Sequence, residues 1–199
     1  MSQQQDVIVV GSSTAAGIVV TELARAGLHV VVLEHREEAE NKSIKEAAEE
    51  TGNVALRCSV HMGLINRDMK GRVSGVSFFN EVGEAEDLEA EIVILGGNAR
   101  ENARLLLVSD INSSGQVGKA SGPGHANTAG YGTHRMGWNR KESVVDAYGE
   151  VHECKGLYAI GEGQLADSPY GSVVNTIEAL AHMTADRLLY RTSTDSSCL

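Results

Sequence analysis

The chain of 199 residues has few prolines, cysteines and aromatic side chains: two prolines, three cysteines and 4% aromatic residues. So few aromatic rings offer no platform on which nucleic-acid bases could stack. Cys58, Cys154 and Cys198 lack the spacing of a metal site, so no metal site is predicted. An odd number of cysteines is typical of a reducing compartment, and we therefore expect a cytoplasmic protein.

Long apolar runs and basic clusters are also missing. No run approaches the roughly 18 apolar residues that a membrane span needs, and the net charge of -10 argues against a nucleic-acid partner. A chain of this length with 42% hydrophobic residues can bury one core. The sequence predicts a single domain over residues 1–199, with a flexible tail at 1–4, a second tail at 192–199, and no affinity for nucleic acid or membrane.

Residues 6–34 have the pattern strand, turn, helix, strand and acid. Residues 6–10 and 29–33 are β-branched runs, and residues 15–26 between them carry apolar side chains at helical spacing. In such a unit the pyrophosphate of a dinucleotide lies at the helix N-terminus, and an acid about 20 residues further on binds the ribose hydroxyls. Glu34 is that acid.

The glycine fingerprint G-x-G-x-x-G of dinucleotide-binding units is altered. Gly11 holds the first place, Ser13 the second and Ala16 the third. Alanine is tolerated in the third place, but Ser13 adds a Cβ where the backbone otherwise approaches the phosphates. A nucleotide-binding unit is the favoured interpretation, and a unit that holds no ligand is the alternative.

The next segments predict a helix and a β-meander. Residues 37–52, rich in Glu, Lys and Ala, predict a short solvated connector helix, with Ser43 and Glu46 spaced as a capping box. Residues 54–60 are predicted to form the first meander strand, and residues 88–95 the third. The parallel unit and the meander together predict an α/β fold.

The C-terminal half contains a linker and one more strand end. Residues 110–131 are dense in Gly, Ser and Asn and predict a linker. The strand at residues 156–160 is followed by Gly161 and Glu162, which places a carboxylate at the sheet edge where ligands usually bind. A closing helix is expected at residues 174–190.

Four segments in this order resemble the glucose-methanol-choline (GMC) family of FAD-dependent oxidoreductases, and GTHRMG is similar to the pyranose-oxidase branch. They are DVIVVGSSTAAGIVVTELARAGLHVVVLE, then GRVSGVSFF with AEIVILGGNARENARLLLVS, then GTHRMGWNRKESVVDAYGEVHECKGLYAIGEG, and NTIEALAHMTADRLL. The resemblance implies FAD as cofactor and an FAD/NAD(P)-binding Rossmann-like three-layer fold with a parallel sheet and a small antiparallel β-meander. It also implies oxidation of the CH–OH group of a small alcohol or sugar.

The same resemblance implies which residues contact FAD. The turn after the first strand would meet the pyrophosphate, the residues after the second strand the adenosine, and one backbone position the adenine. The glycine and acid after the last strand would meet the ribityl or pyrophosphate region, and the closing helix would offer backbone N–H groups to the flavin pyrimidine. In that order, the implied residues are Gly11, Ser12, Ser13, Ala16, Glu34, His35, Val60, Gly161, Glu162, Val173 and Val174.

Other family features are absent from this chain. The substrate-binding domain of the family would be inserted in two pieces, and its places hold only the helix at 37–52 and the linker at 110–131. Ala129 stands where the family has its catalytic histidine. His134 and His125 lie near that motif and are the candidate bases, although a structural imidazole is favoured for each.

Three functions therefore stay open. The favoured one is an FAD-binding domain with weak or absent alcohol oxidation. The second is a small active FAD oxidoreductase, and the third is a scaffold or binding protein that holds no cofactor. Removal of the substrate domain would leave apolar surface exposed, so a homo-oligomer is expected.

Overall fold

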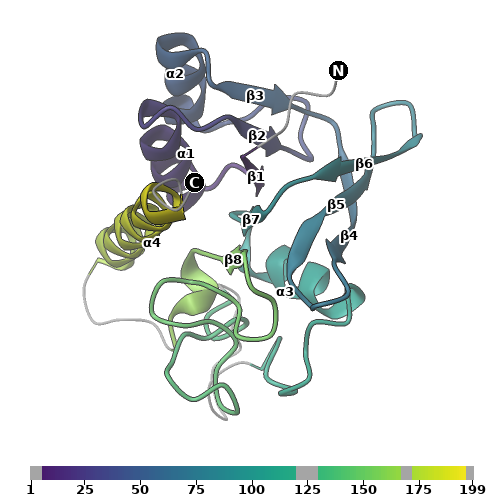
Figure 1. Ribbon diagram of the computed structural model, residues 1–199, viewed down its shortest axis with the longest axis vertical. Coiled ribbons are helices and arrows are strands. Elements are labelled where there is room, and N and C mark those ends of the chain that lie inside the picture. The colour runs from purple at the N-terminus through teal and green to yellow at the C-terminus, as the bar shows by residue number, and fades with distance from the viewer. Residues whose placement is uncertain (1–5, 120–129, 167–171, 196–199) are drawn as a thin grey trace.

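A five-stranded parallel sheet forms the middle of the protein in the computed structural model, which describes residues 6–119, 130–166 and 172–195 (Figure 1). Its strand order is β3-β2-β1-β7-β8, and every neighbouring pair is parallel. The carboxyl ends of all five strands therefore lie at one edge. The strands are β1 (Val7–Val10), β2 (Val30–Leu33), β3 (Val54–Arg57), β7 (Ile92–Leu95) and β8 (Leu157–Ala159).

Two further layers cover the sheet. Helices pack on one face, and an antiparallel meander with one helix packs on the other (Figure 1). The first layer contains α1 (Thr14–Arg25), α2 (Lys42–Thr51) and α4 (Val173–Asp195). The second contains β4 (His61–Arg67), β5 (Val73–Phe79), β6 (Ala85–Glu89) and α3 (Ala99–Val108). A single 3₁₀ turn, η1 (Glu162–Gln164), follows β8.

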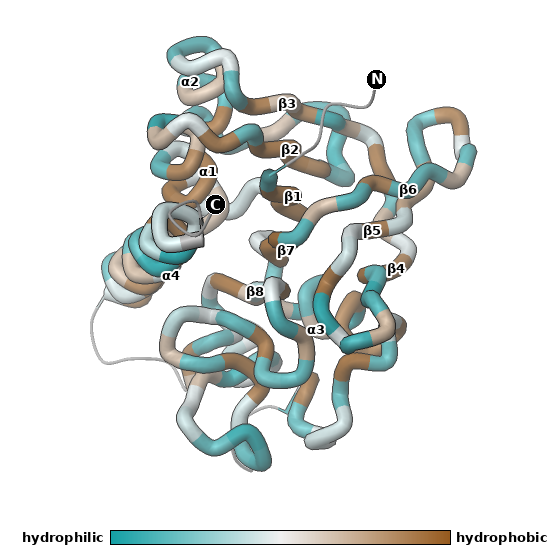
Figure 2. Tube along the Cα trace, viewed as in Figure 1, coloured by the Kyte–Doolittle hydropathy of each residue, from teal (hydrophilic) through white to brown (hydrophobic). Residues whose placement is uncertain are grey.

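The middle strands are apolar on both faces because both faces are covered. Val7 and Val9 pack against the helices, whereas Ile8 and Val10 pack against the meander and α3. Successive strand side chains point to opposite faces, so a strand between two layers needs a continuous apolar run rather than an alternating one. Figure 2 shows this run as brown segments along β1 and β2.

Helix α2 does not begin as predicted. Asn41 is its N-cap, and the Asn41 side chain accepts a hydrogen bond from the Ser43 N–H. The capping box expected at Ser43 and Glu46 is therefore wrong, because Ser43 already lies inside the helix. The predicted end is confirmed: Gly52 adopts the left-handed conformation, with φ of 68°. Ile44 is fully buried in the helix-side core.

The first and third meander strands were predicted in the wrong place. β3 joins the parallel sheet, where Val54 pairs with Val30 of β2, and Val60 follows β3 before β4 begins. The meander consists of β4, β5 and β6. The segment predicted as one strand at residues 88–95 contains the end of β6 and the whole of β7, with residues 90 and 91 between them. Side-chain alternation indicates a strand but not its partner, which explains both errors.

Helix α4 closes the molecule against α1. Leu180 and Leu188 are buried, as the helical spacing predicts. Near its end Arg191 donates hydrogen bonds to the Tyr158 hydroxyl of β8 and to the Glu150 carboxylate. This contact ties the last helix to the edge strand of the sheet. Within the described ranges, no helix is both long and apolar enough to cross a membrane.

Neighbouring leucines of α3 provide a test of the core. Leu106 is fully buried and Leu107 is 47% exposed. We expect Leu106→Ala to lower the free energy of unfolding by about 2–5 kcal/mol, since it removes buried methyl groups and leaves a cavity. Leu107→Ala, the matched control, is expected to change it by less than about 0.5 kcal/mol. Urea denaturation measures both, and equal effects would show that α3 does not pack as described.

Candidate functional site

A cavity of about 860 Å³ opens at the carboxyl edge of the parallel sheet. This volume lies in the range of ligand and cofactor sites. The residues that follow β1, β2, β7 and β8 line it, together with residues of α1, α3 and α4 and the start of β4. The chain therefore brings four strand ends and two helix N-termini to one cavity, as expected for a parallel sheet that binds a ligand at this edge.

The turn after β1 lines this cavity and contains N–H groups for which the described residues provide no acceptor. Ser13 is the N-cap of α1, and its hydroxyl accepts a hydrogen bond from the Ala16 N–H. Among the described residues, no hydrogen-bond acceptor is found for the N–H groups of Ser12, Thr14 and Ala15. All three residues line the cavity. Free N–H groups at the positive end of a helix dipole favour a bound anion.

Glu34 follows β2, the strand beside β1, and its side chain contacts the same turn. Its side chain is buried, and its carboxylate accepts a hydrogen bond of 2.5 Å from the Ser12 hydroxyl and one of 3.1 Å from the Arg36 N–H. A carboxylate has about four acceptor sites, so Glu34 can still accept hydrogen bonds from a ligand. The Ser12 hydroxyl and the Arg36 N–H together set the orientation of this carboxylate.

Two imidazoles stand beside Glu34 at the cavity. The rings of His35 and His61 are 4.4 Å apart and meet edge to face, with an interplanar angle of 85°. Both line the cavity together with Met62. His35 was predicted to contact an adenosine, but His61 was not assigned to the site. Its contact with His35 depends on the segment before β4 lying beside the residues that follow β2, where the Val60 N–H donates to the Glu34 carbonyl oxygen, and the sequence does not reveal this.

The end of β8 supplies a second carboxylate. Gly161 has φ of 106° and ψ of -158°, a conformation that essentially only glycine adopts. Glu162 follows it and lines the cavity. Burial raises the pKa of Glu162, an effect that the Ala99 N–H and the Arg100 guanidinium oppose only in part. This carboxylate is held against the N-terminus of α3, where a negative charge is favourable.

Four of the predicted cofactor residues do not line the cavity. Ala16 is buried, and its Cβ fills the space left by the absent side chain of Gly96. Val60 is also buried, and its N–H donates to the carbonyl oxygen of Glu34. Val173 and Val174 begin α4, and Val174 is half exposed. The other seven, Gly11, Ser12, Ser13, Glu34, His35, Gly161 and Glu162, do line it.

His134 is buried in the interior of the protein and does not line the cavity. It is fully buried, its Nδ1 lies 3.2 Å from the Thr133 hydroxyl, and its Nε2 has no hydrogen-bond partner within the described residues. A side chain on Gly163 would overlap the imidazole, so the ring packs against bare backbone. Burial lowers its pKa to about 4, which the Ile160 carbonyl offsets only in part. These surroundings favour a neutral structural imidazole.

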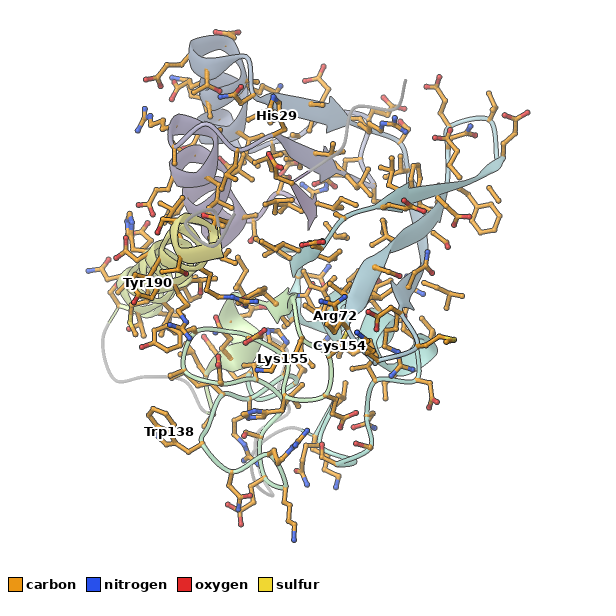
Figure 3. The ribbon with its side chains drawn as sticks, viewed as in Figure 1. His29, Arg72, Trp138, Cys154, Lys155 and Tyr190 are labelled. Carbon is orange, nitrogen blue, oxygen red and sulfur yellow. The ribbon has the colours of Figure 1, made fainter. Side chains whose placement is uncertain are left out.

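The second candidate base, His125, and the position of Ala129 lie outside the described residues. The GTHRMG segment itself ends at the surface. Trp138, which follows it, is 89% exposed and projects away from the body of the protein (Figure 3).

The structure adds site residues after β7 that the sequence did not single out. Gly97 and Asn98 line the cavity, followed by Glu101 and Arg104 of α3. Arg104 donates to the Glu101 carboxylate and to the Met62 carbonyl oxygen, and so ties α3 to β4. The apolar run of β7 followed by Gly96 and Gly97 was the available signal, because β1 is also an apolar run that a glycine, Gly11, follows.

A family model described as GMC oxidoreductase matches residues 43–181 of the chain. No curated protein sequence matches it significantly.

Solved structures show the fold. Pyridoxine 4-oxidase from Mesorbium loti aligns with a TM-score of 0.74 at 9% identity, over 94% of this chain and 99% of that one. THI4 from Thermovibrio ammonificans aligns with a TM-score of 0.62 at 13% identity, over 96% and 90%. The chain spans only 38% of the myxobacterial halogenase CndH, with a TM-score of 0.42 at 12% identity over 49% of this chain. The predicted FAD/NAD(P)-binding Rossmann-like fold is confirmed.

The buried His134 predicts a pH dependence of stability. Its pKa is about 4 in the folded chain against 6.5 for a free imidazole, so below pH 6.5 the unfolded chain takes up a proton that the folded chain does not. Stability is therefore expected to fall as the pH drops from 6.5 to 4, by up to about 3 kcal/mol. Urea denaturation across this range measures the loss.

A control isolates this contribution from the other groups that titrate in the same range. His134→Gln is expected to make the free energy of unfolding depend less steeply on pH between 6.5 and 4 than it does in the unsubstituted chain. If the variant does not fold, an NMR titration of the His134 ring gives the same information. A ring that protonates near pH 6.5 would contradict the buried placement.

Proposed function

The chain belongs to the GMC oxidoreductase family, and we propose that it is an FAD-binding protein of this family whose oxidation of CH–OH groups is weak or absent. FAD is the cofactor that the family and the fold support. One observation carries the proposal: Glu34 lines the same cavity as Ser12, Thr14 and Ala15, whose N–H groups have no acceptor among the described residues. An anionic pyrophosphate joined to a ribose with two hydroxyls fits these two features together.

The residues of this chain would hold the adenosine half of FAD as follows. The N–H groups of Thr14 and Ala15 would donate to the pyrophosphate, with Ser12 beside them. Glu34 would accept hydrogen bonds from the ribose hydroxyls, in the orientation that the Ser12 hydroxyl maintains. Val60 could reach the adenine only through its carbonyl oxygen, because its N–H already donates to Glu34.

The flavin half would lie toward the end of β8 and the start of α4. Gly161 leaves open space at the cavity, and Glu162 would accept a hydrogen bond from the ribityl chain. Val173 and Val174 would offer N–H groups of the first turn of α4 to the flavin pyrimidine, where the positive end of the helix dipole favours a reduced, anionic ring.

The expectation of weak or absent oxidation depends on the position of the family's catalytic histidine, which Ala129 holds in this chain. When bound, FAD supplies the acceptor for the two electrons removed from a CH–OH group. A neighbouring side chain must then take the hydroxyl proton, with a pKa near the working pH. His134 is buried away from the cavity, with its pKa lowered to about 4. Asn175, near the family's second catalytic position, is exposed at the start of α4.

Uptake of FAD is the direct test of this proposal. We expect the purified protein, after incubation with FAD and desalting, to keep the visible absorption of bound flavin. Addition of small alcohols or sugars is expected to bleach these bands slowly or not at all. A flat spectrum would overturn the proposal and favour a scaffold without cofactor, whereas fast bleaching would show an active oxidoreductase.

A substitution at Glu34 locates the binding site. Glu34→Ala removes the acceptor for the ribose hydroxyls and is expected to raise the dissociation constant (Kd) for FAD by about 10- to 100-fold, the value of a charged hydrogen bond. Glu37→Ala is the matched control, because Glu37 is exposed and lies outside the cavity. Flavin fluorescence titration measures both, and equal Kd values would place FAD elsewhere.

A further inference from the structure

Asn41 connects the turn after β1 to helix α2. Its side chain is half buried between α1 and α2. The amide nitrogen Nδ2 donates to the Ser13 carbonyl oxygen at 2.8 Å, and the amide oxygen Oδ1 accepts from the Ser43 N–H at 3.0 Å. One amide therefore caps α2 and holds the turn before α1.

Gly17 makes room for this amide. A Cβ at Gly17 would overlap the side-chain amide atoms of Asn41, although the glycine lies in the helix and has an ordinary helical conformation. Glycine in a helix interior costs about 1 kcal/mol relative to alanine. The contact with Asn41 gives a reason for a glycine at this position.

The Ser13 peptide is the point on which the turn is fixed. Its carbonyl oxygen accepts from the Gly17 N–H at 2.9 Å as well as from Asn41, and its N–H donates to the Gly96 carbonyl at 3.2 Å. Ser13 stands where the fingerprint has its second glycine. The bonds that hold this peptide determine where the next N–H groups, those of Thr14 and Ala15, point.

We propose that Asn41 is a positioning residue for the cofactor, since it holds the Ser13 carbonyl so that the N–H groups at the start of α1 stay directed at the pyrophosphate. The inference rests on the proposed binding of FAD. Gly17 and Asn41 act as a pair: the missing side chain of one admits the amide of the other. The residue that stabilises the altered fingerprint thus comes from the segment after the second strand, outside the fingerprint itself.

A purely structural role as the cap of α2 makes a different prediction. Aspartate is as good an N-cap as asparagine and has the same shape, but its carboxylate cannot donate to the Ser13 carbonyl. Asn41→Asp therefore keeps the cap and removes the contact with the turn. Ile44→Val is the matched control: it removes one methyl group from the buried face of α2 and destabilises the helix packing without touching the turn.

The test compares the Kd for FAD with hydrogen exchange of residues 11–17 in the ligand-free protein. We expect Asn41→Asp to raise the Kd about tenfold and to speed exchange in this segment, since one hydrogen bond that orders the turn is lost. Ile44→Val is expected to lower the melting temperature while leaving the Kd and this exchange unchanged. Equal Kd and exchange in Asn41→Asp and the unsubstituted chain would overturn the inference.

A second variant tests the pairing with Gly17. Gly17→Ala should raise the Kd by a similar factor, because the new methyl group displaces the Asn41 amide, even though alanine favours the helix. The double variant should be little weaker than either single one, since both remove the same contact. Additive effects would overturn the pairing. Failure of the unsubstituted chain to bind FAD would instead overturn the proposed function.

Discussion

The close approach of two turns at the sheet edge is the constraint on which the site depends. Gly11 follows β1 and Gly97 follows β7, and a Cβ on Gly11 would lie 2.5 Å from the Cα of Gly97. Gly11 also has φ of 91°, which side chains other than glycine rarely adopt. Because the two turns touch, the N-termini of α1 and α3 open into one cavity rather than two.

Around this contact, hydrogen bonds tie the residues that line the cavity to one another and to neighbouring elements. Ser12 fixes Glu34, Arg104 ties α3 to β4, and Asn41 links α2 to the start of α1. Each bond joins segments that are distant in sequence, so the loops that line the cavity are tied to one another. In binding sites generally, hydrogen bonds of this kind, from residues behind those that touch the ligand, keep the contacting groups close to the geometry that binding needs.

The departures from the glycine fingerprint are accommodated by the backbone. Ser13 has φ of -63° and ψ of 172°, an ordinary extended conformation, so its side chain causes no backbone strain. Its hydroxyl serves as the N-cap of α1, a task for which serine is among the preferred residues. Ala16 in the third place is buried against Gly96, which has no side chain. The space that a glycine at position 16 would leave is thus provided by the glycine at position 96 instead. The altered motif thus keeps the fold of the dinucleotide-binding unit.

The sequence by itself determined the parallel unit, the acid at Glu34, the Gly-Glu pair after the last strand and the closing helix. These features are local, because β-branched runs, helical spacing and turn glycines act within about 30 residues. Only the tertiary structure decided that β3 joins the parallel sheet, that His61 and Asn98 reach the cavity and that His134 is buried. Strand pairing, burial and the contacts between distant side chains depend on how the layers pack. The hydrophobic period of a segment predicts a helix or a strand, but it does not identify the segment against which that element packs.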